Sequence, residues 1–180
     1  MLFRSDSPPH PYPMLRKLTL LLLVAGAAAN SFAAAKPNIL FCIADDASYQ
    51  HFSANGCRWV QTPAFDRVAR EGLRFARAYT PNAKCAPSRA TVLTGRNSWQ
   101  LEAAGDHGGF YPAGYRTFME ALGANGYKTG FTGKGWGPGD PGKVDGKARL
   151  LTGPAFSELK TTPPTSNISA VDYAANLADF

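Results

Sequence analysis

A continuous apolar run over residues 38–44 is the first regular pattern in the chain, and it ends at two adjacent acidic residues, Asp45 and Asp46. A run of this length without polar interruption predicts a strand that is covered on both faces, as in the centre of a parallel sheet. The two carboxylates would then stand at the carboxyl end of the strand. That edge is where open α/β sheets bind their ligands.

Two helices are predicted from their end signals. Thr62 and Pro63 form an N-cap and a first helical position, apolar residues follow at helical spacing, and the helix stops at Gly72. Pro87 suits the first turn of a second helix, which closes at Gly95 in a left-handed conformation.

A third helix is capped by Thr117 and closed by Asn125 and Gly126. Ser169 with Asp172 opens a last amphipathic segment that continues to the end of the sequence. These two segments add helical elements to the second half of the chain.

Residues 73–79 and 127–132 predict two further strands, and residues 133–164 are so rich in Gly and Pro that a surface excursion is expected there. Strands thus alternate with helices along most of the chain. This order predicts an α/β layered fold with a mainly parallel central sheet.

The segment 1–35 is interpreted as a leader and not as part of the fold. A basic pair at 16–17 precedes an apolar stretch over 18–29, and a small-x-small pattern at 31–33 is typical of a cleavage site for a secretory signal peptide. An uncleaved anchor helix is the alternative. Met14 is predicted to be the true start, because the residues before it are Pro-rich and charged. The mature protein would be exported, to the periplasm or the extracellular space.

Composition narrows the class of protein. A hydrophobic content of 44% with 18% charged residues argues against general disorder. No apolar run reaches the roughly 18 residues that a membrane span needs. The formal net charge of +6 comes from scattered basic residues, and no nucleic-acid-binding module is visible. Residues 36–180 are therefore expected to form part of one globular domain without a membrane span or a nucleic-acid partner.

Three cysteines, Cys42, Cys57 and Cys85, make an odd number for an exported chain. Cys42 lies in an apolar run and is predicted to be a small buried hydrophobe. No pair has the spacing of zinc ligands. At least one thiol is therefore free for another role.

Cys85 begins the run Cys-Ala-Pro-Ser-Arg, which continues as Leu93-Thr94-Gly95-Arg96. It would lie at a helix N-terminus, where unpaired N–H groups and the helix dipole favour a reactive thiol and bind anions such as sulfate. A cysteine that only packs is the alternative. The run resembles the Cys-x-Pro-Ser-Arg and Leu-Thr-Gly-Arg signature of the type I sulfatases, formylglycine-dependent enzymes of the alkaline phosphatase superfamily. The resemblance covers residues 37–135.

The resemblance implies that a formylglycine-generating maturation enzyme oxidises Cys85 to 3-oxoalanine (formylglycine). The hydrated aldehyde would attack sulfur through one hydroxyl and release the bound sulfate through the other, which is covalent catalysis. Asp45 and Asp46, with the converted Cys85, would hold a divalent metal, Ca²⁺ or alternatively Mg²⁺, because both prefer oxygen ligands. A solvated Asp-Asp turn is the other interpretation of that pair.

Arg89 follows Cys85 by one helical turn and can reach back to the formylglycine hydroxyl or to an Asp ligand. Lys134 matches the family lysine that bridges sulfate and formylglycine, although a lysine in a Gly-rich loop is usually only solvated. Where the family often has Trp-His after Gly-Lys, this chain reads Gly135-Trp136-Gly137. The pattern is somewhat similar to the sulfamidase (heparan N-sulfatase) branch.

The resemblance implies a sulfatase that acts on sulfate esters or sulfamates, with a sulfated small molecule or glycan as substrate. His107, in a predicted loop near the pocket mouth, is a candidate substrate contact. Because family members are longer and hold further metal ligands downstream, residues 36–180 are expected to be the N-terminal part of the catalytic domain. An inactive or binding-only protein is one alternative. A related phosphatase or phosphodiesterase is another, although Cys85 stands where those enzymes use Ser or Thr.

Overall fold

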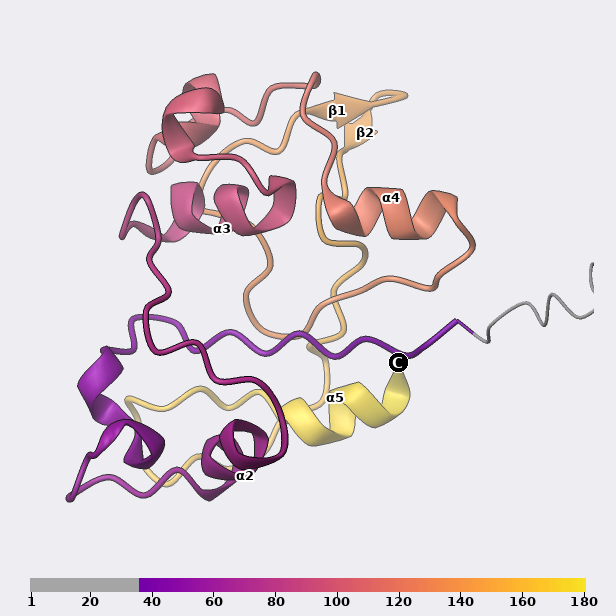
Figure 1. Cartoon of the computed structure of the whole chain (residues 1–180). Coiled ribbons are helices and arrows are strands. Elements are labelled where there is room, and N and C mark those ends of the chain that lie inside the picture. Colours follow the sequence, from indigo (N-terminus) through magenta and orange to yellow (C-terminus); the bar gives the residue numbers. More distant parts are fainter. Residues whose placement is uncertain (1–35) are drawn as a thin grey trace, which may run out of the picture. The chain divides into compact units, whose positions relative to one another are not determined.

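The computed structural model describes residues 36–180, which Figure 1 shows as a ribbon coloured along the sequence. The chain divides into two units, Met1–Ala44 and Asp45–Phe180. The predicted leader, residues 1–35, lies outside the described residues. In the first unit, the described residues 36–44 belong to no helix or strand.

The first predicted helix is confirmed as α2 (Pro63–Glu71). It starts after Thr62 with proline in its first turn, and it ends at Gly72, whose N–H donates to the Val68 carbonyl at 2.9 Å. Two short 3₁₀ helices, η1 (Tyr49–His51) and η2 (Ser53–Asn55), precede it.

Helix α3 (Cys85–Thr94) confirms the second predicted helix and begins at the cysteine itself. Pro87 lies in the first turn, where its missing N–H has no intrahelical acceptor to lose. Gly95 ends the helix with φ 69°, and its N–H donates to the Thr91 carbonyl at 2.8 Å. The left-handed conformation at this position favours glycine.

A small core forms where α3 meets η3 (Ser98–Gln100), η4 (Glu102–Gly105) and α4 (Phe118–Ala124). In Figure 1, α3 and α4 lie beside one another in the second unit. Tyr115 and Trp136 pack against this core from its edge. The buried members of the core are Ala90, Leu101, Ala104, Tyr111 and Leu151.

Helix α4 begins with a capping box, which confirms Thr117 as its cap. The Thr117 hydroxyl accepts from the Glu120 N–H at 3.1 Å, and the Glu120 carboxylate accepts from the Thr117 N–H at 2.8 Å. The Glu120 carboxylate also contacts the Arg149 guanidinium at 2.6 Å. One acidic side chain thus caps the helix and binds a distant loop to it.

The only strands among residues 36–180 are β1 (Lys143–Val144) and β2 (Lys147–Ala148), which form an antiparallel hairpin. The mainly parallel central sheet that the sequence predicts is therefore not observed in the described part of the chain. Residues 127–132 contribute one isolated parallel bridge, Phe131 with Ala155. Residues 73–79 form none.

The strand predicted over residues 38–44 is not formed either, and its apolar side chains are exposed; Ile39 and Leu40 retain 58% and 67% of their accessible surface. An apolar run becomes a central strand only when other strands pair with it on both sides. The described residues offer only β1 and β2, which pair with each other. Cys42, predicted to be buried, is exposed with this segment.

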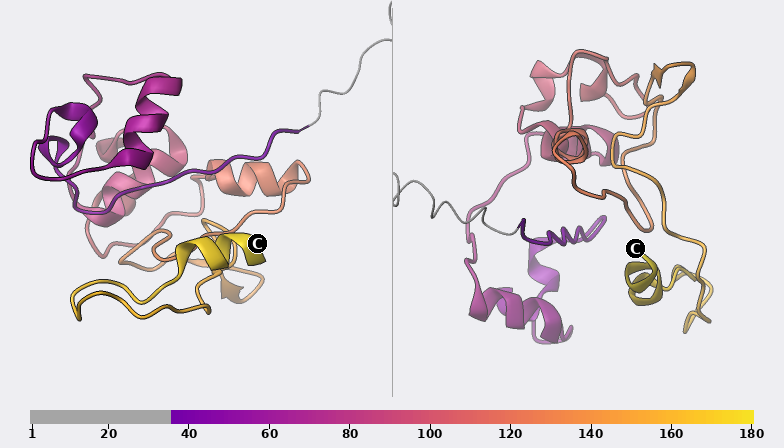
Figure 2. Two further views of the ribbon diagram at one scale, coloured as in Figure 1. Left: turned by 90° about the horizontal axis from the view of Figure 1, so that it is seen from below. Right: turned by 90° about the vertical axis from the view of Figure 1, so that its right-hand side faces the viewer.

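The Gly- and Pro-rich segment 133–164 was expected to be a surface excursion, and this is only partly correct. Most of it runs without regular structure, as both views in Figure 2 show. Leu151, however, is only 3% exposed and belongs to the core. Its carbonyl accepts the buried hydroxyl of Thr117 at 2.8 Å. The segment therefore turns inward once to complete the core.

The last predicted helix is confirmed as α5 (Tyr173–Asp179), but its predicted start at Ser169 is wrong. Asp172 is the cap, because its carboxylate accepts from the Ala175 N–H at 2.9 Å, whereas Val171 pairs in an isolated bridge with Lys160. Asn176 is 1% exposed and pairs with both backbone polar groups of Leu159. Within residues 36–180, no helix has the length and apolar character needed to cross a membrane.

Candidate metal and anion site

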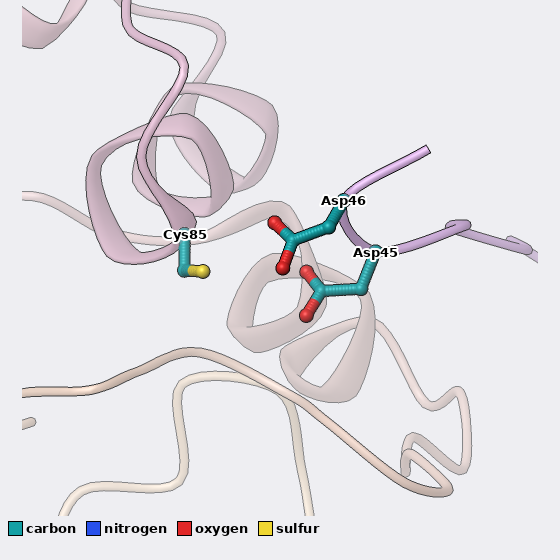
Figure 3. Close-up of side chains that lie close together, drawn as sticks. All are labelled: Asp45, Asp46 and Cys85. Atoms are coloured by element: carbon teal, nitrogen blue, oxygen red, sulfur yellow. The ribbon is translucent and has the colours of Figure 1, made fainter. Parts of the chain in front are cut away.

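Asp45, Asp46 and Cys85 come together, although 39 positions separate the second aspartate from the cysteine in the numbering. One ligand atom from each lies within 4.8 Å of the others. Figure 3 shows both carboxylates turned toward the Cys85 side chain, which projects from the first residue of α3. The Asp-Asp pair lies in a turn before η1. The three groups that the sequence assigned to a metal thus meet at one helix N-terminus.

Asp46 adopts a left-handed backbone conformation, with φ 53°. Side chains other than glycine rarely occupy this region, and aspartate is among those that tolerate it best. The turn sends the two adjacent carboxylates to the same side, as Figure 3 shows. Two adjacent carboxylates repel each other, and two cationic side chains that contact Asp45 offset this repulsion.

Arg89 is the first of these neighbours. Its side chain is 8% exposed, and Nη2 donates to Asp45 Oδ1 at 3.0 Å, one of the two contacts that the helical spacing predicted. Nη1 donates to the carbonyls of Lys134 and Gly135 at 2.7 and 2.8 Å. One guanidinium therefore joins the carboxylate turn to the loop that follows Phe131.

Lys134 is the second cation, and its Nζ contacts Asp45 Oδ2 at 2.5 Å. The hydrogen bonds from Lys134 and then from Arg89 lower the pKa of Asp45 below its ordinary value. In the other direction, contact with Asp45, and then with Cys85, raises the pKa of Lys134. Lys134 is therefore paired and not merely solvated, and its ammonium lies beside the cysteine.

Trp136 is a member of this environment that the sequence reasoning missed. Its Nε1 donates to the Ala86 carbonyl in the first turn of α3 at 3.1 Å. The bonds from Arg89 to the Lys134 and Gly135 carbonyls were missed as well. The sequence marks Trp136 only as part of the departure from the family's Trp-His pattern and as a large aromatic residue in a Gly-rich stretch, and neither signal gives a partner.

The donor set fits a hard divalent cation in part. Two carboxylates supply oxygen ligands of the kind that Ca²⁺ and Mg²⁺ prefer, whereas an unmodified thiol at position 85 would be a soft third ligand. An oxygen-bearing group at that position would make all three ligands hard. Ca²⁺ takes about 6–8 oxygen ligands, so these three residues would supply part of a coordination shell.

His107 is exposed in the turn after η4. It is not among the residues that group as possible metal ligands in the described chain. A contact between His107 and substrate remains a prediction.

The site thus brings together a cysteine at a helix N-terminus, two adjacent carboxylates, and the cationic side chains of Arg89 and Lys134. The family model described as Sulfatase matches residues 37–171. The match covers most of the chain, including every residue of the site. The chain belongs to the sulfatase family.

Several curated proteins are similar to this chain. An N-acetylglucosamine-6-O-sulfatase of Bacteroides thetaiotaomicron is 36% identical over 125 residues, 69% of this chain and 22% of the relative. Arylsulfatase A of Bos taurus is 39% identical over 121 residues, 64% of this chain and 24% of the relative. An N-acetylgalactosamine-6-O-sulfatase of Bacteroides thetaiotaomicron is 37% identical over 110 residues, 57% of this chain and 22% of the relative.

The matched region thus spans less than a quarter of the length of each of these relatives. No solved structure matches the chain.

Proposed function

We propose that this chain supplies the nucleophile, two metal ligands and two charge-stabilising side chains of a sulfatase that hydrolyses sulfate esters or sulfamates of carbohydrates. The observation that carries the proposal is the meeting of Asp45, Asp46 and Cys85 within 4.8 Å. Family membership supports the reaction class. The hexosamine sulfates in the names of two relatives favour a carbohydrate substrate.

Asp45, Asp46 and the converted residue 85 would hold the divalent cation, Ca²⁺ or Mg²⁺. Such an ion supplies positive charge next to the nucleophile and the sulfate. The Arg89 guanidinium holds Asp45 in place through one nitrogen, and its bonds to the Lys134 and Gly135 carbonyls hold the loop through the other. Side chains and carbonyls of the protein itself therefore orient the Asp45–Asp46 turn.

Cys85 would act as formylglycine, the product of a formylglycine-generating partner enzyme. The hydrate of that aldehyde supplies an oxygen nucleophile and a second hydroxyl on the same carbon. Lys134 lies beside this position with its charge fixed by Asp45, and it would stabilise negative charge on the sulfate during transfer. His107 would contact the substrate from its exposed turn.

For the whole protein we propose an alkaline phosphatase-like α/β fold and export to the periplasm or extracellular space. Family membership supports the fold, and the basic and apolar pattern within residues 1–35 supports the export.

The conversion of Cys85 is tested by producing the chain with and without a formylglycine-generating enzyme. Trypsin releases a peptide from Cys85 to Arg89, because Lys84 precedes it. Mass spectrometry should find the aldehyde only after co-production, and the Cys85→Ala variant should lack it. An intact thiol after co-production would contradict the proposed nucleophile.

The reaction class is tested by comparing turnover of an aryl sulfate and an aryl phosphate by the protein that carries the aldehyde. We expect desulfation, and its loss in Cys85→Ala. Preference for the phosphate would contradict the proposed substrate class and favour a related phosphatase.

Metal binding is tested separately with Tb³⁺ as a luminescent substitute for Ca²⁺. Trp136 lies next to the first turn of α3 and can sensitise an ion bound there. We expect Asp46→Asn to weaken binding by at least about tenfold, because it removes one of two carboxylate ligands. Asp145→Asn, in the exposed β1–β2 turn, is the matched control. Equal affinity in all three proteins would contradict the proposed metal site.

A further inference from the structure

Trp136 joins the loop that carries Lys134 to the helix that carries Cys85. Its indole Nε1 donates to the Ala86 carbonyl at 3.1 Å. Ala86 is fully buried and lies three residues before Arg89, so both residues lie on one face of α3. Arg89 on that face binds the Lys134 and Gly135 carbonyls. The loop is thus attached to the same helix face at two points.

The indole is also held from its other sides. Its ring meets Tyr111 edge to face, with centroids 5.2 Å apart at 85°. Tyr111 is fully buried, and the Arg149 guanidinium lies 5.2 Å from the centroid of its ring. A Cβ at Gly139 would lie 2.6 Å from the indole, so the chain leaves no room there for a side chain. The indole therefore cannot turn away from α3 without disturbing the core.

We propose that Trp136 is a positioning residue for Lys134. This inference rests on the proposed function for its catalytic meaning, but its structural content is independent of it. The indole fixes the backbone two residues after Lys134, and Arg89 fixes the Lys134 carbonyl itself. Together they place the lysine side chain where its ammonium contacts Asp45, beside Cys85. Without the indole bond, the loop keeps one attachment to α3 and the ammonium leaves the carboxylate more often.

The test measures how fast each lysine is acetylated by an N-hydroxysuccinimide ester, by peptide mass spectrometry. It uses the unmodified chain without metal or substrate. Two variants remove the indole N–H and retain an aromatic ring: Trp136→Phe, and site-specific replacement of Trp136 by benzothienylalanine, which keeps the shape. The loss of one hydrogen bond, about 1 kcal/mol, should raise the acetylation rate of Lys134 about fivefold. The rates of Lys143 and Lys147 should stay unchanged.

Trp99→Phe is the matched control, because Trp99 is 74% exposed and lies in η3. If Trp136→Phe raises the rates of all lysines together, the variant has unfolded, and the benzothienylalanine protein decides the question. An unchanged Lys134 rate in that folded protein would overturn the proposal. A faster Lys134 together with an absence of desulfation in the mature protein would instead overturn the proposed function and leave the positioning role intact.

Discussion

Residues 45–79 and residues 85–151 belong to the same unit, yet they are built in different ways. No residue in 45–79 is buried, and α2 leaves Phe65 46% and Val68 71% exposed. The second region holds every member of the hydrophobic core. The first is therefore shaped by local polar bonds, such as those of Ser53 with Thr62 and Asp66, and the second by apolar packing.

The candidate site draws on both regions, so its parts are held by different forces. Cys85 stands at the end of a helix whose inner face is buried. Asp45 comes from the exposed region, and Arg89 and Lys134 bind its carboxylate. The position of Cys85 thus depends on the core, and the position of the Asp45 carboxylate depends on ion pairs. Mutations in the two regions should therefore have effects of different size and kind.

The largest difference is expected between two leucines that are truncated in the same way. Leu101 is fully buried in the core, whereas Leu73 is 88% exposed. We expect Leu101→Ala to lower the free energy of unfolding by about 2–5 kcal/mol, through lost burial and a residual cavity. Leu73→Ala should change it by less than about 0.5 kcal/mol. Urea unfolding followed by circular dichroism measures both, and equal losses would show that the two regions pack alike.

The next effect is expected at Arg89, where the two regions meet. Arg89→Lys keeps the charge but cannot bind two carbonyls and a carboxylate at once, because a lysine lacks the planar fork of donors. We expect the free energy of unfolding to fall by about 2 kcal/mol, mostly because two carbonyls lose their donor. The Asp45 carboxylate contributes less to this loss, because it is 40% exposed and water can replace part of the contact.

Arg96→Lys is the matched control for this loss. Arg96 is exposed in the described chain and lies over the Tyr115 ring at 5.5 Å. If both variants lose the same stability, the fork of Arg89 is not what joins the two regions.

The same contrast explains how much of the fold the sequence could predict. All four α-helices of the described chain were predicted, because their ends carry local signals such as Thr62 before Pro63, Gly95, and Asp172. Strands carry no such local signal, since a strand exists only with a partner. The run at 38–44 has the composition of a central strand but no neighbouring strand among the described residues.

The candidate site was predictable where spacing or a motif was available. The position of Arg89, one helical turn after Cys85, predicted contact with the formylglycine hydroxyl or with an Asp ligand, and the second is observed. Lys134 was found from its match to a family motif. The bonds from Arg89 to the loop and from Trp136 to Ala86 join positions 45 to 50 residues apart. One sequence contains no pattern that specifies contacts at such a separation.

A smaller effect, dependent on pH, is expected inside the packed region. Burial alone would raise the pKa of Glu120, but hydrogen bonds from Arg149 and Thr117 outweigh it and lower that pKa below its ordinary value of 4.5. At a pH between the folded and unfolded pKa values of Glu120, the unfolded chain binds more protons than the folded chain. The stabilisation that the ionised Glu120 carboxylate gives to the fold is therefore complete above about pH 4.5 and is lost as the pH falls through the folded pKa.

Glu120→Gln should therefore lower the free energy of unfolding by about 1–2 kcal/mol at pH 7. The difference in this free energy between the variant and the wild type should shrink as the pH falls below 4.5. Unfolding in urea over this range of pH measures it, with exposed Glu158→Gln as the control. A difference that is constant with pH would mean that the charge of Glu120 does not carry the effect.

The smallest effect is expected from the ion pair of Arg67 and Glu71 on α2, in the exposed region. The two side chains are 71% and 59% exposed, and Nε lies 3.1 Å from Oε2 across one helical turn. Because water and salt screen such a pair, Arg67→Met should lower the free energy of unfolding by no more than about 0.5 kcal/mol. The decrease should be smaller still in about 1 M NaCl. A double-mutant cycle with Glu71→Gln isolates the pair energy in urea unfolding. A coupling energy above about 1 kcal/mol would mean that ion pairs stabilise the exposed region more than such exposed side chains normally do. The exposed and packed regions would then differ in the kind of interaction that stabilises them and not in how stable they are.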